Sequence, residues 1–261
     1  HAGEVHGILG ENGAGKTTLL NILGGIIRPD VGSLEMGGTP VRLQSARAAW
    51  EMGVGLVHQH FTLVPGLSVL ENLALGWRHE GRRWTLRLEE IRQEAYRLGR
   101  LTGLNVPFEA SIEELGVGDR QRIEILKALL RDPQLLVLDE PTAVLAPAEI
   151  EQLFGLLRTL ANEGRAVVLV AHKLDEILSI ADRVTVLRDG RTVMTAALAD
   201  LDAAVLTEAM VGPSSREGEE PEARMREVSS LFGQGTESLA RDRALAARAV
   251  ASLNGISVYG P

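Results

Sequence analysis

Apolar residues form two kinds of pattern along this chain. Continuous apolar runs at 4–10, 134–140 and 165–172 predict strands that are buried on both faces. Apolar residues spaced three or four apart predict helices at 17–27, 86–101, 118–132 and 148–164. The pattern also predicts short strands within 33–43, a short helix at 45–52, a strand from 54, a helix at 173–181, a hairpin over 182–195 turning at Asp189-Gly190, and a last helix ending near Val211.

This alternation of strands and helices predicts an α/β fold with a mostly parallel sheet flanked by helices and a small antiparallel β part. The piece from about 70 to 132 has no convincing strand, so we interpret it as an inserted helical subdomain. Residues 213–230 are charged and serine-rich, with Pro213 and Pro221, which is typical of a linker.

A glycine-rich stretch joins the first predicted strand to the first predicted helix. It has the spacing G-x-x-x-x-G-K-T from Gly10 to Thr17. Glycines let the backbone turn its N–H groups toward a phosphate, and the helix that follows adds its positive end. Lys16 would reach the outer phosphates and Thr17 would place its hydroxyl on Mg²⁺. The residues predicted to bind nucleotide here are Gly10, Glu11, Asn12, Gly13, Ala14, Gly15, Lys16, Thr17 and Thr18.

Polar residues also follow three other predicted strands. Asp139 and Glu140 end the run LLVLDE, where Asp139 would hold Mg²⁺ through water and Glu140 would polarise the water that attacks the γ-phosphate. His172 ends the next strand and would hydrogen-bond the γ-phosphate or that water. Gln59 ends another and would reach the metal or the water. A lone histidine or glutamine is more often an ordinary polar residue whose hydrogen bonds are satisfied within the protein. From the strand pattern alone, His172 and Gln59 therefore remain either such residues or part of a nucleotide site.

Composition narrows the class of protein. Apolar residues make up 45% of the 261, enough for a core, and the net charge of -8 argues mildly against a nucleic-acid partner. The chain has no cysteine, which excludes disulfides and thiolate metal sites. No apolar run approaches the roughly 18 residues that span a bilayer. Lysine occurs only at Lys16, Lys127 and Lys173, and all other basic residues except histidine are arginine.

The phosphate loop, the glutamine, LGVGDRQR, LLVLDEPT and the strand-ending histidine occur in an order that resembles the ATP-binding subunits of ABC transporters, over residues 1–211. VHQHFTLVPGLSVLENLALG is most similar to importers of nucleosides, and next to ribose-type sugar importers, in which two ATPase domains are fused. The resemblance implies ATP and Mg²⁺ as cofactors, with Thr17, Gln59 and Asp139 around the metal and Glu140 and His172 catalytic. It also places Ala143–Ala146 in a loop that contacts the partner ATPase domain.

The resemblance implies that Leu115, Gly116, Val117, Gly118 and Asp119 form the signature segment, which caps the γ-phosphate held by the opposing domain. The chain departs from the family at Gly116, where serine is usual, and at Asp119, where glutamine is frequent. Losing the hydroxyl removes a hydrogen bond worth roughly 1.5–3 kcal/mol to a charged acceptor. We therefore expect a weaker site wherever this segment is used, unless the carboxylate of Asp119 points away.

The same resemblance implies transmembrane permease subunits and a second ATPase domain as partners, a solute-binding protein indirectly, and no nucleic acid. It implies a cytoplasmic position at the inner face of the membrane. We interpret 212–249 as the linker and 250–261 as the start of a second ATPase domain, so that the chain is a fragment whose first domain lacks its N-terminal strands. The alternatives are a soluble ABC ATPase acting on ribosomes or DNA, and a nonfunctional truncated product.

Overall fold

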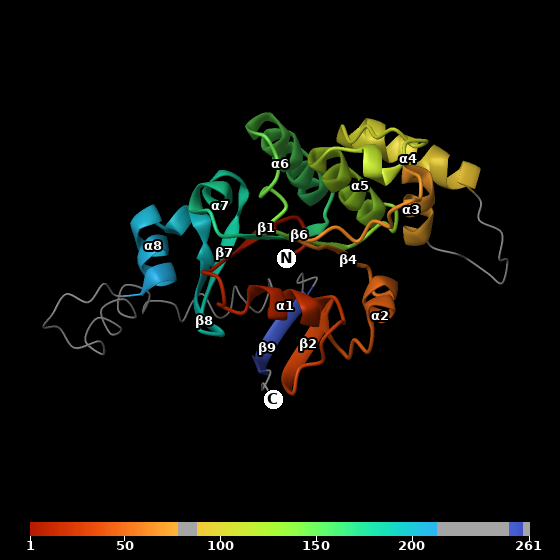
Figure 1. Cartoon of the computed structure of the whole chain (residues 1–261). Coiled ribbons are helices and arrows are strands. Elements are labelled where there is room, and N and C mark those ends of the chain that lie inside the picture. Colours follow the sequence, from red (N-terminus) through yellow and green to blue (C-terminus); the bar gives the residue numbers. More distant parts are fainter. Residues whose placement is uncertain (78–87, 213–250, 258–261) are drawn as a thin grey trace, which may run out of the picture.

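A largely parallel sheet forms the centre of the molecule (Figure 1). The computed structural model describes residues 1–77, 88–212 and 251–257. Within these residues, six strands lie in the order β4-β5-β6-β1-β7-β8. Their bounds are β1 Val5–Leu9, β4 Val54–Val57, β5 Leu135–Asp139, β6 Ala166–Ala171, β7 Arg183–Arg188 and β8 Arg191–Ala197. All neighbours pair in parallel except β7 and β8, which form the predicted hairpin.

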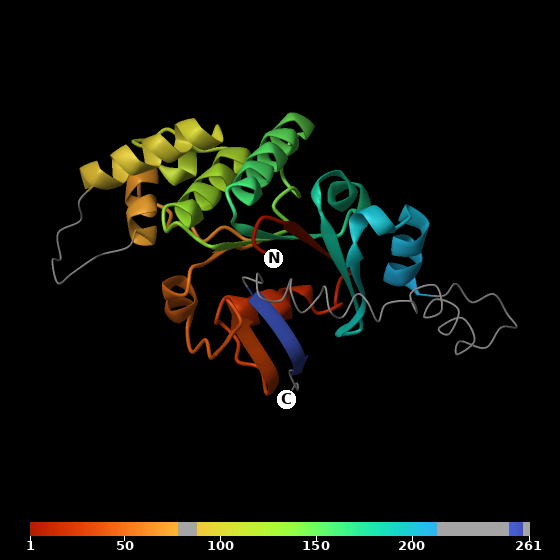
Figure 2. The same ribbon diagram turned by 180° about the vertical axis from the view of Figure 1, so that it is seen from behind.

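Helices pack on both faces of this sheet. Figures 1 and 2 show α3 to α7 over one face, and α1 with the small second sheet at the other. The helices are α1 Lys16–Leu23, α2 Ala46–Glu51, α3 Val69–Gly76, α4 Leu88–Thr102, α5 Val117–Leu129, α6 Pro147–Asn162, α7 Leu174–Ile180 and α8 Ala203–Val211, with short 3₁₀ turns at Ile112–Glu114 and Leu198–Asp200. Because both faces are covered, every residue of β5 is buried, as its unbroken apolar run requires.

The region predicted as a helical subdomain contains α3, α4, the first 3₁₀ turn and α5. A capping box begins α3, because the Ser68 hydroxyl accepts from the Glu71 N–H at 3.2 Å and the Glu71 carboxylate accepts from the Ser68 N–H at 2.8 Å. The apolar side chains of these helices pack in one cluster with those on the covering face of the sheet. The limits of this subdomain stay a prediction.

A small antiparallel sheet contains strands from distant parts of the sequence. β2 (Val31–Met36) pairs with β3 (Thr39–Val41) on one side and with β9 (Ala251–Ser257) on the other. The linker predicted at 212–249 lies outside the described residues apart from Gly212, and so does the end of the second-domain segment predicted at 250–261. Their assignment stays a prediction.

Two helix ends test the sequence patterns. The helix predicted over 17–27 is too long, because α1 ends at Leu23 and Gly25 turns the chain with φ 69°. Ile26, which lies within the predicted helix, is outside α1 and is 51% exposed. By contrast, Gly164 ends α6 as predicted, with φ 91° and its N–H on the carbonyl of Ala161.

Candidate nucleotide site

The phosphate loop lies between β1 and α1, as its glycines predict. Gly15 adopts a left-handed conformation with φ 98° and caps α1 without any side-chain hydrogen bond, so the first N–H groups of the helix stay available to an anion. A Cβ on Gly10 would lie 2.5 Å from the carbonyl oxygen of Leu187, so only glycine fits there. The loop therefore presents a backbone cradle that matches a phosphate group.

Lys16 points into this loop. Its side chain is only 6% exposed, and the ammonium donates to the carbonyl oxygens of Gly10 at 2.8 Å and Glu11 at 3.1 Å. Thr17 and Thr18 follow in the first turn of α1 with exposed side chains. Each predicted nucleotide-binding residue of this stretch thus belongs to the loop or to the first turn of the helix, and its role in binding stays a prediction.

Glu140 is the centre of the polar cluster at the carboxyl edge of the sheet. Its Oε2 accepts from Nε2 of Gln59 at 3.0 Å and lies 3.4 Å from Nδ1 of His172, while its Oε1 lies 3.9 Å from Nζ of Lys16. Gln59, His172 and Lys16 follow β4, β6 and β1, respectively. These three strands and β5, which precedes Glu140, are adjacent in the sheet in the order β4-β5-β6-β1. The structure therefore brings together the four residues that the sequence places after separate strands.

Backbone geometry also singles out Glu140. It is one of the non-glycine residues with positive φ, at 47°, and its N–H donates to the carbonyl of Val170 on the neighbouring strand. A left-handed conformation is unfavourable for a residue with a Cβ and persists where surrounding contacts hold it. This sharp turn after β5 aims the carboxylate at Gln59 and His172, and its side chain is 12% exposed.

Asp139 ends β5 beside this cluster. It is 5% exposed, and its carboxylate has no hydrogen bond or ion pair among the described residues. Burial, and then the neighbouring charge of Glu140, raise its pKa above the ordinary 3.8, although His58, Lys16 and His60 act in the opposite direction. A buried carboxylate without a partner fits a role as an acceptor for a hydrated cation, which would relieve its desolvation.

The protein side chains alone do not form a complete metal site. Among the described residues, no group of three or more His, Asp or Glu side chains could hold an ion. A Mg²⁺ ion in a phosphate-binding site commonly takes its remaining ligands from water and phosphate oxygens. The Thr17 hydroxyl, the Gln59 amide oxygen and the Asp139 carboxylate suit that arrangement chemically, and their roles as metal ligands stay a prediction.

The predicted signature segment lies at the start of α5. Leu115 precedes the helix, and Gly116 is its N-cap, which has no side chain to cap the helix. The effect of the missing hydroxyl on phosphate binding stays a prediction. The Asp119 carboxylate is directed to Arg122, whose Nη1 lies 2.8 Å from Asp119 Oδ1 and whose Nη2 lies 2.7 Å from Glu149 Oε1. The unfavourable charge predicted at Asp119 is therefore paired within the chain, while Val117 is 46% exposed at the helix end.

Sequence reasoning missed a polar contact of a buried residue near the site, Thr142, and a neighbouring ion pair of the exposed Lys173. Thr142 is 4% exposed, and its hydroxyl donates to Oε2 of Glu176 at 2.6 Å, which joins the segment after β5 to α7. Lys173 lies 3.2 Å from the other oxygen of Glu176. Thr142 and Glu176 are 34 residues apart, so no local motif marks their contact, whereas Lys173 and Glu176 are only three residues apart. The threonine within LLVLDEPT was the available signal.

The comparisons assign the family. The model of the ABC transporter family matches residues 1–143. The glucose import ATP-binding protein TsgD13 of Haloferax volcanii is 40% identical over 99% of this chain and 54% of its own length. The nucleoside import ATP-binding protein NupA of Lactococcus lactis is 44% identical over 81% of this chain. The ribose import ATP-binding protein RbsA 3 of Rubrobacter xylanophilus is 46% identical over 80% of this chain. In both cases the match covers 42% of the relative's own length. The chain therefore belongs to the ABC transporter ATP-binding family, and spans about half the length of these relatives.

Solved structures agree with this assignment. A dimeric bacterial ABC transporter cassette has a TM-score of 0.67 and 29% identity, covering 76% of this chain and 87% of that one. A post-hydrolysis state of the same cassette, bound to ADP and Pi, has a TM-score of 0.65 and 28% identity over the same shares. The fold is thus that of an ABC-type P-loop NTPase. Within the described residues, the helices are too short or too polar to cross a membrane.

Proposed function

We propose that this chain is the nucleotide-hydrolysing part of an ATP-driven membrane importer. The observation that carries the proposal is the convergence of Lys16, Gln59 and His172 on Glu140, at the edge of the sheet beside the phosphate loop. ATP would bind with its phosphates on the loop residues 10–18, and bound Mg²⁺ would neutralise phosphate charge. Family membership and the cassette bound to ADP and Pi support this reading.

The side chains would divide the work of hydrolysis. Lys16 would turn from the carbonyls of Gly10 and Glu11 to the outer phosphates, where its charge is better matched. Glu140 would accept a proton from the attacking water, and His172 would orient that water or the γ-phosphate. Gln59 would report the presence of the phosphate and metal, because its amide already bonds to the proposed base.

Two ATPase domains would complete each site between them. The exposed Val117 end of α5 would face the γ-phosphate held by a second domain, and the loop 143–146, where Val144 is 49% exposed, would contact that domain. The relative solved as a dimer supports such a pairing. Residues 250–261 would begin this second domain and 212–249 would link the two.

Permease subunits are the proposed membrane partners. A groove of ≈ 340 Å³ lies between α2 and β4 on one side and α3 and α5 on the other, and includes the exposed side chains of Trp50 and Leu75. It adjoins the segment that follows Gln59, so a permease segment seated there would be mechanically linked to the site. The protein would then sit in the cytoplasm at the inner face of the membrane, with a solute-binding protein acting through the permease.

The cargo is proposed at the level of a small polar solute. The named relatives import nucleosides, ribose and glucose, and we favour nucleosides or related solutes with ribose-type sugars as the alternative. Uptake of labelled nucleoside and of labelled ribose by cells with and without the gene distinguishes these. A soluble ABC ATPase is the other candidate; copurification with ribosomes or DNA and without a permease would favour it.

The decisive test of nucleotide chemistry is Lys16→Ala in the full-length gene product. ATP affinity should fall at least about tenfold and hydrolysis should be lost, because the charge-assisted contacts to the phosphates disappear. Arg47→Ala is the matched control, since it also removes a cation but from a side chain that is 83% exposed on α2. Normal ATP turnover by the Lys16 variant would refute the proposal.

A further inference from the structure

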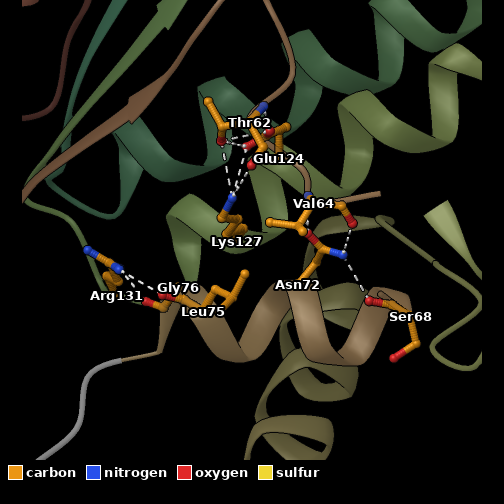
Figure 3. Close-up of polar contacts among 9 residues, drawn as sticks. All are labelled: Thr62, Val64, Ser68, Asn72, Leu75, Gly76, Glu124, Lys127 and Arg131. Atoms are coloured by element: carbon orange, nitrogen blue, oxygen red, sulfur yellow. Dashed lines mark hydrogen bonds and ion pairs between the residues drawn. The ribbon is translucent and has the colours of Figure 1, made fainter. Parts of the chain in front are cut away.

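A small polar cluster joins the segment after Gln59 to the helices that cover the sheet. We propose that Thr62, Glu124 and Lys127, here called the clamp, position Gln59 for hydrolysis, and that Glu124 and Lys127 are positioning residues of the reaction. This inference rests on the proposed ATPase function. Figure 3 shows the clamp above the end of α3, with Lys127 and Glu124 both directed at Thr62.

The first part of the clamp is a buried carboxylate. Glu124 lies on α5, is 6% exposed, and accepts from both donors of Thr62: the backbone N–H, and the hydroxyl at 2.9 Å to Oε1 and 3.1 Å to Oε2. A carboxylate in such a place requires donors, because burying it unpaired is costly. Thr62 is three residues after Gln59, whose amide donates to Glu140 at the other end of the same segment.

The second part is a lysine one turn further along α5. Nζ of Lys127 lies 3.7 Å from Glu124 Oε2, and donates to Thr62 at 3.1 Å to Oγ1 and 3.4 Å to the carbonyl oxygen. A compact ammonium with three donors suits three acceptors in one small space, whereas a planar guanidinium does not. The chain uses arginine for nearly all its other cations, so lysine at this position is a specific chemical choice.

Close packing places the lysine. A Cβ on Gly76 would lie 2.7 Å from Cγ of Lys127, so the glycine at the end of α3 leaves room for the lysine stem. Arg131, also near the end of α5, donates to the carbonyls of Gly76 and Leu75 (Figure 3) and stacks on Trp50 with 3.5 Å to the ring centroid. The clamp is therefore anchored on α3 and α5 and lies beside α2.

The far end of the segment is held from α3. Asn72 is fully buried, accepts from the Val64 N–H at 2.7 Å, and donates to the carbonyls of Val64 and Ser68 at 3.1 Å each. The segment between β4 and α3 is thus bonded to the helices at Thr62 and Val64 and to Glu140 at Gln59. A displacement of α3 and α5 relative to the sheet would move the glutamine that contacts the base.

The clamp also lines the groove proposed for the permease. Thr62, Glu124 and Lys127 all border it, together with Trp50, Leu75 and Arg131. A segment seated in the groove would press on Thr62 and on the ammonium of Lys127. Hydrogen bonds and one backbone segment connect Lys127, Glu124, Thr62, Gln59 and Glu140 without a gap. Such a network can carry coupling between two sites.

The experiment uses the full-length gene product with Thr62→Val, Glu124→Gln and Lys127→Arg. Thr62→Val removes only the hydroxyl from an exposed residue of similar shape. Glu124→Gln leaves one acceptor oxygen for two Thr62 donors. We expect kcat for ATP hydrolysis to fall about tenfold in each, which is one lost charge-assisted hydrogen bond, while the Kd for ATP changes by less than about twofold. Thr62→Ser, which retains the hydroxyl, should keep the wild-type kcat.

The matched controls at exposed positions are Glu151→Gln on α6, which makes the same exchange as Glu124→Gln, and Arg100→Lys on α4, which makes the reverse exchange of Lys127→Arg. Wild-type kcat in Thr62→Val and Glu124→Gln would overturn the clamp. So would an equal loss of kcat and ATP affinity that Thr62→Ser does not rescue, because that indicates a structural role alone. A wild-type protein that binds no ATP would instead refute the proposed function, so the two failures are distinguishable.

Discussion

Replacing Glu140 with glutamine is the most informative perturbation of the proposed site. The substitution keeps the volume of a side chain that is 12% exposed and keeps an oxygen for the Gln59 amide now at 3.0 Å. It removes the charge beside Lys16 and the group proposed to accept a proton from water. If Glu140 is the general base, the cost is the typical contribution of such catalysis, about 10²- to 10⁴-fold in kcat. At 1.36 kcal/mol per decade, this raises the barrier by about 2.7–5.4 kcal/mol.

Binding should respond in the opposite direction. A negative charge next to bound phosphates is repulsive, so Glu140→Gln should leave ATP affinity unchanged or higher. The pKa of Asp139 should also fall, because Glu140 is the second cause of its elevation after burial. The altered protein is therefore expected to retain ATP together with its metal.

Two measurements on the full-length protein separate these effects: single-turnover release of labelled phosphate, and equilibrium binding of ATP. Glu151→Gln, an exposed position on α6, is the matched control. A kcat within about threefold of wild type would show that Glu140 is not the base. Loss of ATP binding would show instead that its carboxylate holds the site together, and the assigned role would be wrong.

Three further predictions follow from single positions. Burial and then Glu140 raise the pKa of Asp139 in the folded chain, so the charged carboxylate lowers stability at a pH above that pKa. Asp139→Asn should therefore raise the Tm of the nucleotide-free protein at pH 7, and this gain should disappear below about pH 3.8, as thermal unfolding would show. The same substitution should weaken Mg²⁺-dependent ATP binding, which titration measures. Gly116→Ser adds an N-cap hydroxyl at a position where a Cβ has no atom within 4 Å. The free energy of unfolding should change by only a few tenths of a kcal/mol, while ATP turnover by the full-length protein should rise up to about tenfold. An unchanged turnover rate would contradict the role proposed for the signature segment. Asn72→Ala should lower the free energy of unfolding, measured by urea denaturation, by about 2–4 kcal/mol, because it leaves buried donors and acceptors unpaired. The control is Asn162→Ala at an exposed position, and an equal effect of the two substitutions would contradict the argument.

Sequence patterns identified the centre of the main sheet because β5 and β6 are nearly unbroken apolar runs, which are typical of strands covered on both faces. The placement of Gln59, Glu140 and His172 was equally accessible, since residues that follow parallel strands share an edge. The hairpin at Asp189-Gly190 was readable as well, and both residues have positive φ, at 51° and 71°.

The parts that sequence reasoning missed depend on tertiary contacts. Glu124 reads as a polar position in an amphipathic helix, yet it is buried because its partner, Thr62, lies 62 residues earlier. Asn72 interrupts the apolar run of α3, and it is buried because its amide bonds to the backbone of Val64 and Ser68 in the preceding segment, which no apolar spacing predicts. The predicted end of α1 was wrong because the apolar spacing continues past Gly24 and Gly25, whereas the helical backbone ends at Leu23.

The order of the strands has a consequence for how the molecule can move. In the described part of the chain, β4 is bonded along one side only, to β5, whereas β1 and β6 each have a neighbour on both sides. A strand at the margin can tilt or fray by breaking a single ladder, so its displacement is cheap compared with that of an interior strand. Lys16 and His172 follow the interior strands β1 and β6, and Gln59 follows the marginal one. The interior strands thus position Lys16 and His172, which must stay fixed during hydrolysis, and the edge strand β4 positions Gln59, which would have to move.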